Sequence, residues 1–368
     1  MWRIGVLFAC FLLGASALAA EPPATSQATS LDYPAAAREV MRHIQKEFYL
    51  PKQGLYAHSP KERHPAYMWA NGVMFTALLG GAKHDPPTYR PQLDAFFKAM
   101  DRYWDAKVKI PGYEPSPTRG GGNDKYYDDN AWMVIAYVEA FELTKDRRYL
   151  RRAEETLAFV LSGWDDAAGG GIWWHEGRKA GTKNACANGP AAFACLRLAT
   201  HQSPEKAAVS VATARKIVAW TTQTLQTKAG RFADSIDAQT GELNPAQLTY
   251  NTALMIRAFM GLYRATGEEE FLRQAQRSAQ AADSFMDAAG RAYRDPVKWS
   301  HLQVEADLEM YRATGEDYLL RRATTNAEHV YAVWKQNPPT ELIDHASIAR
   351  ILWLMADVPA VGAARGTN

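Results

Sequence analysis

The alternation of two kinds of helix restricts the fold of this chain more than any other feature. Beyond about residue 30, apolar residues recur with helical periodicity, and no stretch forms a convincing strand. Segments that are apolar on nearly all sides, such as 67–79 and 129–144, alternate with amphipathic segments such as 91–105 and 147–161. An all-round apolar helix is buried, and a striped helix covers it. The sequence therefore predicts an all-α fold of inner and outer helices.

About twelve helices are expected, paired as six hairpins. Their expected ranges are 33–48, 67–79, 91–105, 129–144, 147–161, 188–200, 204–225, 250–265, 268–286, 301–313, 316–334 and 344–355. A weak internal repeat ends three of the apolar helices: Glu142-Leu-Thr-Lys-Asp146, Arg264-Ala-Thr-Gly-Glu268 and Arg312-Ala-Thr-Gly-Glu316. Such repeats indicate stacked helical hairpins, which occur both in open solenoids and in closed toroids.

Loop lengths favour the closed arrangement. Connections that leave the apolar helices are short, whereas those that enter them are long: about 50–66, 107–127, 162–187, 226–248 and 287–300. In an alternating array all long loops lie on one face, and long irregular loops in a compact domain are usually functional. We expect an (α/α)6 barrel over residues 31–357, with a cleft on that face and a tail at 358–368.

The first 30 residues indicate export. Arg3, the apolar run 4–13 and the small residues 17–19 are typical of a signal peptide over 1–20, followed by a polar lead-in at 21–30. The apolar run is too short for a membrane span. A lipid anchor at Cys10 is disfavoured because Phe8 fits a lipoprotein box poorly. We expect a secreted or periplasmic monomer.

Charge and cysteine content exclude some classes of function. The net charge of +2 gives no electrostatic argument for binding nucleic acid. No Cys or His cluster has the spacing of a zinc site, so neither a metal nor a cofactor is expected. Cys186 and Cys195 are predicted to be unpaired thiols, because a helix would hold them too far apart for a disulfide.

The candidate catalytic groups are Asp128 and Asp129, which begin a long apolar helix in Tyr126-Tyr-Asp-Asp-Asn-Ala-Trp132. Retaining glycosidases use two carboxyl groups about 5–5.5 Å apart, close to the separation of neighbouring side chains. Like charges at that distance raise one pKa, which favours one ionised nucleophile and one protonated acid. Simple helix capping remains the alternative. A second pair, Asp165-Asp166, stands in turn-like sequence and is interpreted as a turn.

Further polar and aromatic residues fall at the same face. Trp173 and Trp174 follow a glycine run in a long loop, and their rings suit the apolar faces of sugars as well as packing at the rim. The other residues expected at the starts of inner helices are Tyr67, Trp69, Asn184, Asn188, Tyr250, Asn251, Lys298, Trp299, His301, Asp344 and His345. Each of these could also serve as a helix cap.

Five motifs in order carry a resemblance to a known family. They are Tyr127-Asp-Asp-Asn-Ala-Trp132, Ser162-Gly-Trp-Asp165, Gly170-Gly-Ile-Trp-Trp174, Lys183-Asn-Ala-Cys186 with Asn188, and Thr249-Tyr-Asn251. Over residues 35–285 the chain resembles glycoside hydrolase family 76, the endo-α-1,6-mannanases. The resemblance implies an (α/α)6 barrel and cleavage of internal α-1,6-mannosidic bonds of a mannan, with retention and without a metal.

The resemblance also implies roles for individual residues. Asp128 corresponds to the nucleophile and Asp129 to the general acid/base. The expected sugar-binding residues are Tyr127, Trp173, Trp174, Asn184, Asn188, Tyr250 and Asn251. The chain departs from the family pattern at Thr252, where glutamine is common, at Ala187, where serine is common, and in the segment after Trp299.

Two other functions remain open. An unsaturated-uronide hydrolase would need cations in the cleft to hold a carboxylate. Candidate cations are Arg119, Lys125, Lys183 and Lys298. A glycan-binding protein without catalysis is the other alternative, motivated by the departures from the family pattern.

Overall fold

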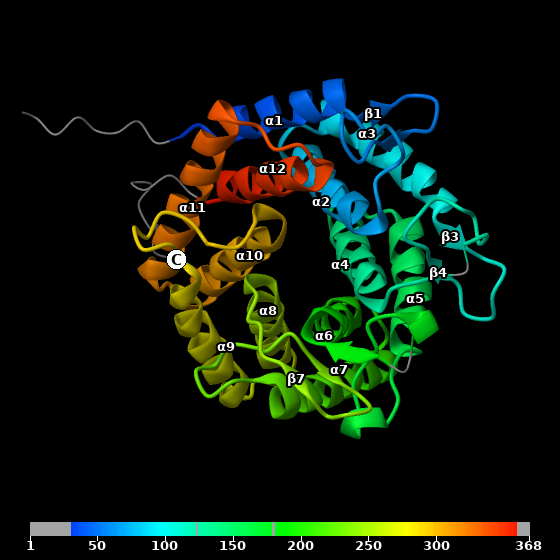
Figure 1. Cartoon of the computed structure of the whole chain (residues 1–368), viewed down its shortest axis with the longest axis vertical. Coiled ribbons are helices and arrows are strands. Elements are labelled where there is room, and N and C mark those ends of the chain that lie inside the picture. Colours follow the sequence, from blue (N-terminus) through cyan, green and yellow to red (C-terminus); the bar gives the residue numbers. More distant parts are fainter. Residues whose placement is uncertain (1–30, 123, 179–180, 359–368) are drawn as a thin grey trace, which may run out of the picture. The chain divides into compact units, whose positions relative to one another are not determined.

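Two concentric rings of helices build the fold (Figure 1). The computed structural model describes residues 31–122, 124–178 and 181–358. The inner ring consists of α2 (Met68–His84), α4 (Tyr127–Thr144), α6 (Ala185–Ala199), α8 (Thr249–Thr266), α10 (Val297–Thr314) and α12 (Leu342–Ala356). The outer ring consists of α1 (Tyr33–Glu47), α3 (Pro86–Ala99), α5 (Arg147–Leu161), α7 (Pro204–Leu225), α9 (Glu269–Ala281) and α11 (Asp317–Gln336). The predicted (α/α)6 barrel is confirmed.

Burial separates the two rings as their sequences predict. Helix α6 buries 14 of its 15 residues, whereas α9 buries only Ala275, Ser278 and Ala279. An inner helix contacts neighbours on all sides, so its apolar residues need no preferred face. An outer helix packs its apolar residues against the inner ring and meets its outer neighbours through polar contacts such as Tyr331 with Glu39, which is why its apolar residues form one stripe.

The internal repeat corresponds to one kind of helix end. Helices α4, α8 and α10 each stop at a residue in the left-handed conformation: Lys145, Gly267 and Gly315, with φ of 61°, 72° and 71°. Glycine adopts this conformation without steric cost, which explains the Thr-Gly pairs. These ends reverse the chain into the next outer helix within a few residues.

The range predicted for the third helix is wrong at both ends. Helix α3 starts at Pro86 rather than near Pro91, because Asp85 caps it and prolines occupy its first turn. It ends at Ala99, and a 3-10 turn, η1 (Met100–Arg102), leads into a strand. The apolar stripe that continues to Trp104 therefore spans three different elements.

Short strands, absent from the sequence prediction, order the loops that enter the inner helices. They form the pairs β1 (Tyr49–Leu50) with β2 (Leu55–Tyr56) and β3 (Trp104–Asp105) with β4 (Gly112–Tyr113), and the sheet β5 (Thr182–Asn184), β6 (Ser235–Asp237), β7 (Leu243–Asn244). Two or three residues are too few to show an alternating pattern. The sheet of β5, β6 and β7 joins two mouth loops that are far apart in sequence.

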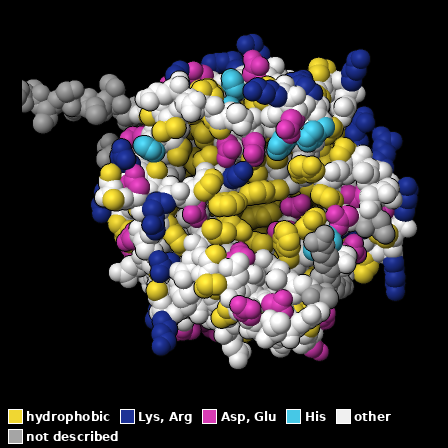
Figure 2. All heavy atoms as spheres, viewed as in Figure 1, with side chains coloured by type: hydrophobic (Ala, Val, Ile, Leu, Met, Phe, Trp, Pro, Cys, Tyr) yellow, Lys and Arg dark blue, Asp and Glu magenta, His cyan; other side chains and the backbone are white. Residues whose placement is uncertain are grey.

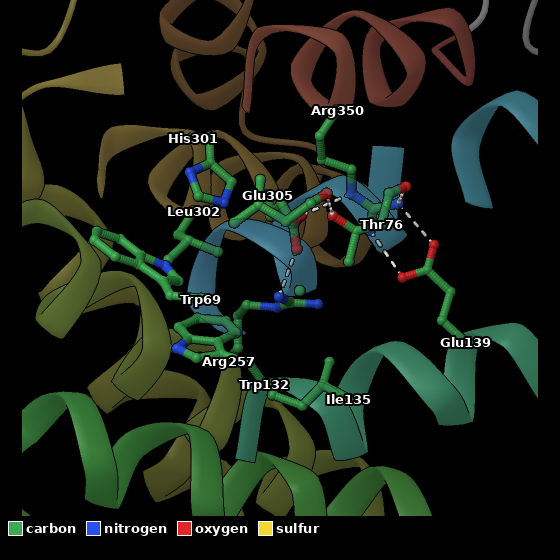
Figure 3. Close-up of a pocket in the computed structure, with 12 residues that line it drawn as sticks. Trp69, Thr76, Trp132, Ile135, Glu139, Arg257, His301, Leu302, Glu305 and Arg350 are labelled. Atoms are coloured by element: carbon green, nitrogen blue, oxygen red, sulfur yellow. Dashed lines mark hydrogen bonds and ion pairs between the residues drawn. The ribbon is translucent and has the colours of Figure 1, made fainter. Parts of the chain in front are cut away.

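A buried ion-pair network ties the inner ring together halfway along the barrel (Figure 3). Glu305 of α10 accepts from Arg350 of α12 at 2.8 Å and from Arg257 of α8 at 2.6 Å. Arg350 also binds Glu139 of α4 at 2.7 Å. Arg257 lies over the ring of Phe193 in α6, 4.3 Å from its centroid. The network thus links α4, α6, α8, α10 and α12.

The predicted signal peptide and the tail beyond Val358 lie outside the described residues, as does Cys10. In the part of the chain that the structure describes, no helix is both long and apolar enough to cross a bilayer. Cys186 and Cys195 are unpaired thiols, as predicted.

Candidate active site

A cleft of about 680 Å³ opens where the long loops gather at the N-terminal ends of the inner helices. Figure 2 shows the hollow, with hydrophobic side chains on its floor. Its aromatic walls are Tyr67, Trp69, Tyr126, Trp132, Trp174, Tyr250 and Trp299. Its carboxylates are Asp128, Asp129 and Asp234. The cleft therefore offers flat apolar surfaces beside acidic groups.

The first turn of α4 directs Asp128 and Asp129 into the cleft because the residues on either side of them face the protein. Tyr127 is fully buried and stacks on Phe159, with 4.9 Å between ring centroids. Asn130 is also buried and its amide binds the backbone of Tyr113 through both its oxygen and its nitrogen. These two anchors leave the intervening carboxylates on the exposed side of the helix.

The two carboxylates have different hydrogen-bond partners. Asp128 Oδ2 accepts from Trp174 Nε1 at 2.8 Å and from Cys186 Sγ at 3.4 Å. Asp128 Oδ1 accepts from the backbone N–H of Asp129 at 2.9 Å. Among the described residues, no group donates to the Asp129 side chain. Donors stabilise a charged carboxylate, so Asp128 is the better candidate for the ionised form.

The pKa values follow the same asymmetry. Burial raises the pKa of Asp128 to about 6, although the bonds from Trp174, the Asp129 backbone and Cys186 oppose this rise. Burial and the charge of Asp128 raise the pKa of Asp129 well above its ordinary value. Asp128 is therefore the member of the pair better suited to carry a charge, and Asp129 the member better suited to keep a proton. Retaining glycosidases use such a pair, with one ionised and one protonated carboxyl group.

A third carboxylate, Asp234, was missed by the sequence analysis. It lies just before β6 and accepts from the side-chain nitrogens of Asn244 at 3.1 Å, Asn251 at 3.3 Å and Asn184 at 3.4 Å. The hydroxyl of Ser235 also donates to it, at 3.2 Å. Its only signal in the sequence is its place in a long mouth loop. A carboxylate held among amides suits sugar hydroxyls, which both donate and accept.

Three of the predicted sugar-binding residues line the cleft: Trp174, Asn184 and Tyr250. Trp174 is 40% exposed and its indole N–H is directed at Asp128. The sequence analysis considered sugar stacking and rim packing for this residue, and the hydrogen bond to Asp128 adds a further role. Other residues predicted at this face, Tyr67, Trp69 and Trp299, line the cleft as well.

The other four predicted sugar-binding residues are not among those that line the cleft. Tyr127 is buried beneath the carboxylates. The indole of Trp173 donates to Asp165 at 2.7 Å. The amide of Asn188 binds the backbone of Ile172 and Asn184, and that of Asn251 supports Asp234. These side chains position the loops and carboxylates that reach the cleft.

Asp165 and the glycines that follow it have structural partners. Asp165 Oδ1 binds Lys183 at 2.7 Å and the backbone N–H of Ala167 at 3.1 Å, in keeping with the predicted turn. Gly171 has φ of 89°, and a Cβ there would lie 2.6 Å from the ring of Trp220. A Cβ at Gly170 would also lie 2.8 Å from the ring of Trp164 and 2.9 Å from that of Trp220, so both glycines allow close packing on tryptophan.

The cations considered for an acidic substrate do not line the cleft. Lys125 is buried between Asp105 at 3.2 Å and Glu176 at 3.1 Å. Lys183 is buried beside Asp165, and Lys298 pairs with Glu341 at 3.1 Å. Arg119 lines a different surface pocket. Of the described residues around the cleft, none is Lys or Arg, so its fixed charges are acidic.

The two histidines predicted at the starts of inner helices are part of the core. His301 and His345 are buried, and burial lowers the pKa of each to about 4. His345 accepts from the indole of Trp334 at 2.9 Å. Within the described ranges, no group of three His, Cys, Asp or Glu side chains is arranged to hold a metal ion.

Comparison with known proteins agrees with this geometry. The model of glycosyl hydrolase family 76 matches residues 32–298, which is more than half of the chain. The chain belongs to glycosyl hydrolase family 76. Its resemblance to that family is therefore confirmed. A relative is the meiotically up-regulated gene 191 protein of Schizosaccharomyces pombe, 29% identical over 221 residues. That match covers 56% of this chain and about half, 48%, of the fission yeast protein.

Solved structures share the fold of this family 76 member. An α-mannanase of Bacteroides thetaiotaomicron has a TM-score of 0.82 and 22% identity, with 89% of this chain and 95% of that one covered. An inactive variant of an α-1,6-mannanase of Salegentibacter, with two neighbouring aspartates replaced by asparagine, binds α-1,6-mannotriose. It has a TM-score of 0.75 and 22% identity, with coverages of 88% and 99%. Dfg5 of Chaetomium thermophilum, in complex with glucosamine, has a TM-score of 0.72 and 15% identity, with coverages of 89% and 91%.

Proposed function

We propose that this family 76 glycosidase cleaves internal α-1,6-mannosidic bonds of a mannan with retention of configuration. The observation that carries the proposal is the unequal pair: Asp128 has three donors, and Asp129 has none within the described chain. The absence of lysine and arginine among the described lining residues favours a neutral sugar chain over an acidic one. It therefore disfavours an unsaturated uronide as substrate.

The reaction proceeds by two displacements. In the first, a carboxylate oxygen of Asp128 attacks the anomeric carbon while Asp129 gives its proton to the departing glycosidic oxygen. The C–O bond breaks, and a mannosyl ester with Asp128 forms. In the second, Asp129, now ionised, takes a proton from water, whose oxygen attacks the same carbon and releases Asp128. The two inversions restore the original configuration.

The remaining cleft residues would bind sugar. Flat rings such as Trp69, Trp132 and Trp299 suit the apolar faces of mannose units. Asp234, Asn184 and Asn244 present oxygen and nitrogen atoms for the hydroxyls. The likeness to α-1,6-mannanases in fold supports α-1,6-mannan as the first substrate to test.

The test is hydrolysis of linear α-1,6-mannan, with α-1,2- and α-1,3-linked mannans as controls. We expect short α-1,6-mannooligosaccharides, whose first-formed reducing ends are α by proton NMR. Asp128→Asn and Asp129→Asn should each lower kcat by at least about 10³-fold. Asp166→Asn, in the second aspartate pair, is the matched control and should keep full activity. Binding of mannan without release of reducing ends would instead indicate a glycan-binding protein.

We also propose that the protein acts as a monomer outside the cytoplasm, since residues 1–20 have the pattern of a signal peptide. Expression of the full-length chain with a C-terminal tag, followed by cell fractionation and mass analysis of the mature N-terminus, tests export. Light scattering of the purified protein tests the monomer. Cytoplasmic retention of the uncleaved chain would contradict export.

A further inference from the structure

Two side chains from different elements donate to one oxygen of Asp128. Trp174 approaches Oδ2 from the loop before β5, and Cys186 approaches it from the first turn of α6. Neither residue has a role in the double displacement described above. We propose that Trp174 and Cys186 are positioning residues that make Asp128, and not Asp129, the ionised member of the pair. This inference rests on the proposed function for its kinetic consequences.

Hydrogen bonds to both oxygens fix the orientation of the Asp128 carboxylate. The backbone N–H of Asp129 holds Oδ1 at 2.9 Å, while the indole and the thiol hold Oδ2 from the other side. Rotation of the carboxylate would break bonds at both oxygens. A nucleophile held in this way needs little reorganisation before attack.

The surroundings of Asp128 contain few other groups that titrate. Those facing the site are Asp129 on its own helix, Tyr126 just before that helix, Cys186 on α6, Tyr250 on α8, Asp234 before β6 and Tyr67 before α2. Helix α10 presents only Trp299 and Leu302 to the cleft. No lysine or arginine among the described lining residues neutralises the pair, so neutral donors are the main local support for the Asp128 charge.

The thiol is suited to donate rather than to ionise. Cys186 is 6% exposed, and burial together with the charge of Asp128 raises its pKa well above the ordinary value. It therefore keeps its proton and shares it with Asp128. A thiol is a weak donor at 3.4 Å, so its effect should be smaller than that of the indole N–H at 2.8 Å.

The experiment compares Trp174→Phe, Cys186→Ala and Cys186→Ser by the pH dependence of kcat/KM on α-1,6-mannooligosaccharides. Loss of a donor should move the acid limb to higher pH, by about 0.5–1 unit for Trp174→Phe and a few tenths for Cys186→Ala. In Cys186→Ser the hydroxyl can still donate to Asp128, so the acidic side of the pH profile should lie where it does in the parent protein. Cys195→Ala, the other buried cysteine of α6, is the control and should leave the limb in place.

A measurement without substrate separates this proposal from the proposed function. Tm is measured from pH 4 to pH 8 for each protein and for the same protein carrying Asp128→Asn. The difference between the two Tm values changes with pH as Asp128 ionises. The pH at the midpoint of this change should be higher in Trp174→Phe and Cys186→Ala than in the parent, even if the parent cleaves no mannan. An unchanged midpoint in Trp174→Phe, or identical behaviour of Cys186→Ala and Cys186→Ser, would overturn the assignment.

Discussion

The inner ring holds buried or partly buried carboxylates at the mouth and halfway along the barrel, and their pKa values are shifted in opposite directions. At the mouth, burial raises the pKa values of Asp128 and Asp129. Halfway down, burial alone would raise the pKa of Glu305, but the charges of Arg350 and Arg257 outweigh it and lower the pKa to about 2. The difference shows that partner charges, rather than depth, decide whether a carboxylate here is poised for chemistry or fixed as part of the scaffold.

The two levels are close neighbours. A small cavity of about 30 Å³ beside the network is lined by Trp69, Trp132 and Leu302, which also line the cleft. A layer of aromatic and aliphatic side chains thus lies between the arginines and the pair Asp128 and Asp129. Had the arginines reached the cleft, they would have lowered the pKa of Asp129 and favoured its ionised form.

Arg350→Met should produce the largest loss of stability. It leaves Glu139 without a cation and Glu305 with Arg257 alone, and breaking a buried ion pair costs about 3–5 kcal/mol. Urea denaturation followed by circular dichroism measures this loss. Arg264→Met is the control: its partner Glu309 keeps Arg257, and Arg264 is half exposed, so about 0.2–1 kcal/mol is expected. Equal losses for both variants would contradict a buried, mutually dependent network.

Asp128→Asn should act in the opposite direction and stabilise the protein while abolishing activity. The pKa of Asp128 is about 6 when folded and about 3.9 when unfolded. Its charge therefore costs folding free energy above pH 6, and the cost disappears below about pH 4, where both states are protonated. We expect a gain of about 1–3 kcal/mol at pH 7 that fades between pH 6 and pH 4.

Thermal unfolding at pH 4, 5, 6, 7 and 8 measures this gain. Asp166→Asn, an exposed aspartate of the second pair, should show no such pH-dependent gain. A gain for Asp128→Asn that persists unchanged at pH 4 would mean that the carboxylate charge is not the source of the cost.

What could be predicted from the sequence depended on how local the determining contacts are. Whether a helix is apolar all round or amphipathic can be read from about fifteen consecutive residues. The two rings and their hairpins could therefore be predicted from the sequence. Asp128 and Asp129 were found because they begin a helix and because five motifs occur in family order. The same local view misplaced α3, since an apolar stripe that crosses three elements looks like one helix.

Contacts between distant segments could not be predicted in this way. The partners in the network are 48 positions apart for Arg257 and Glu305, and 211 apart for Arg350 and Glu139. Asp234 gains its amide partners only after β5, β6 and β7 join two loops. Nor did the sequence show that Trp174 donates to Asp128, because this depends on the path of a loop 46 residues further along.

Glu139→Gln should have the smallest effect and sharpens the contrast between the two levels. Glu139 is the network carboxylate with the most solvent contact, with 28% of its side chain exposed against 8% for Glu305. Glutamine keeps an oxygen that can accept from Arg350, and Glu305 still neutralises that arginine. We therefore expect a loss of about 1 kcal/mol or less by urea denaturation. Glu305→Gln in the same assay should cost more, because it leaves Arg257 and Arg350 buried with less compensating charge. If the two substitutions cost the same, solvent exposure would not determine how much each carboxylate of the network contributes to stability. The carboxylates at the mouth would then differ from those at mid-barrel only in having no arginine partner.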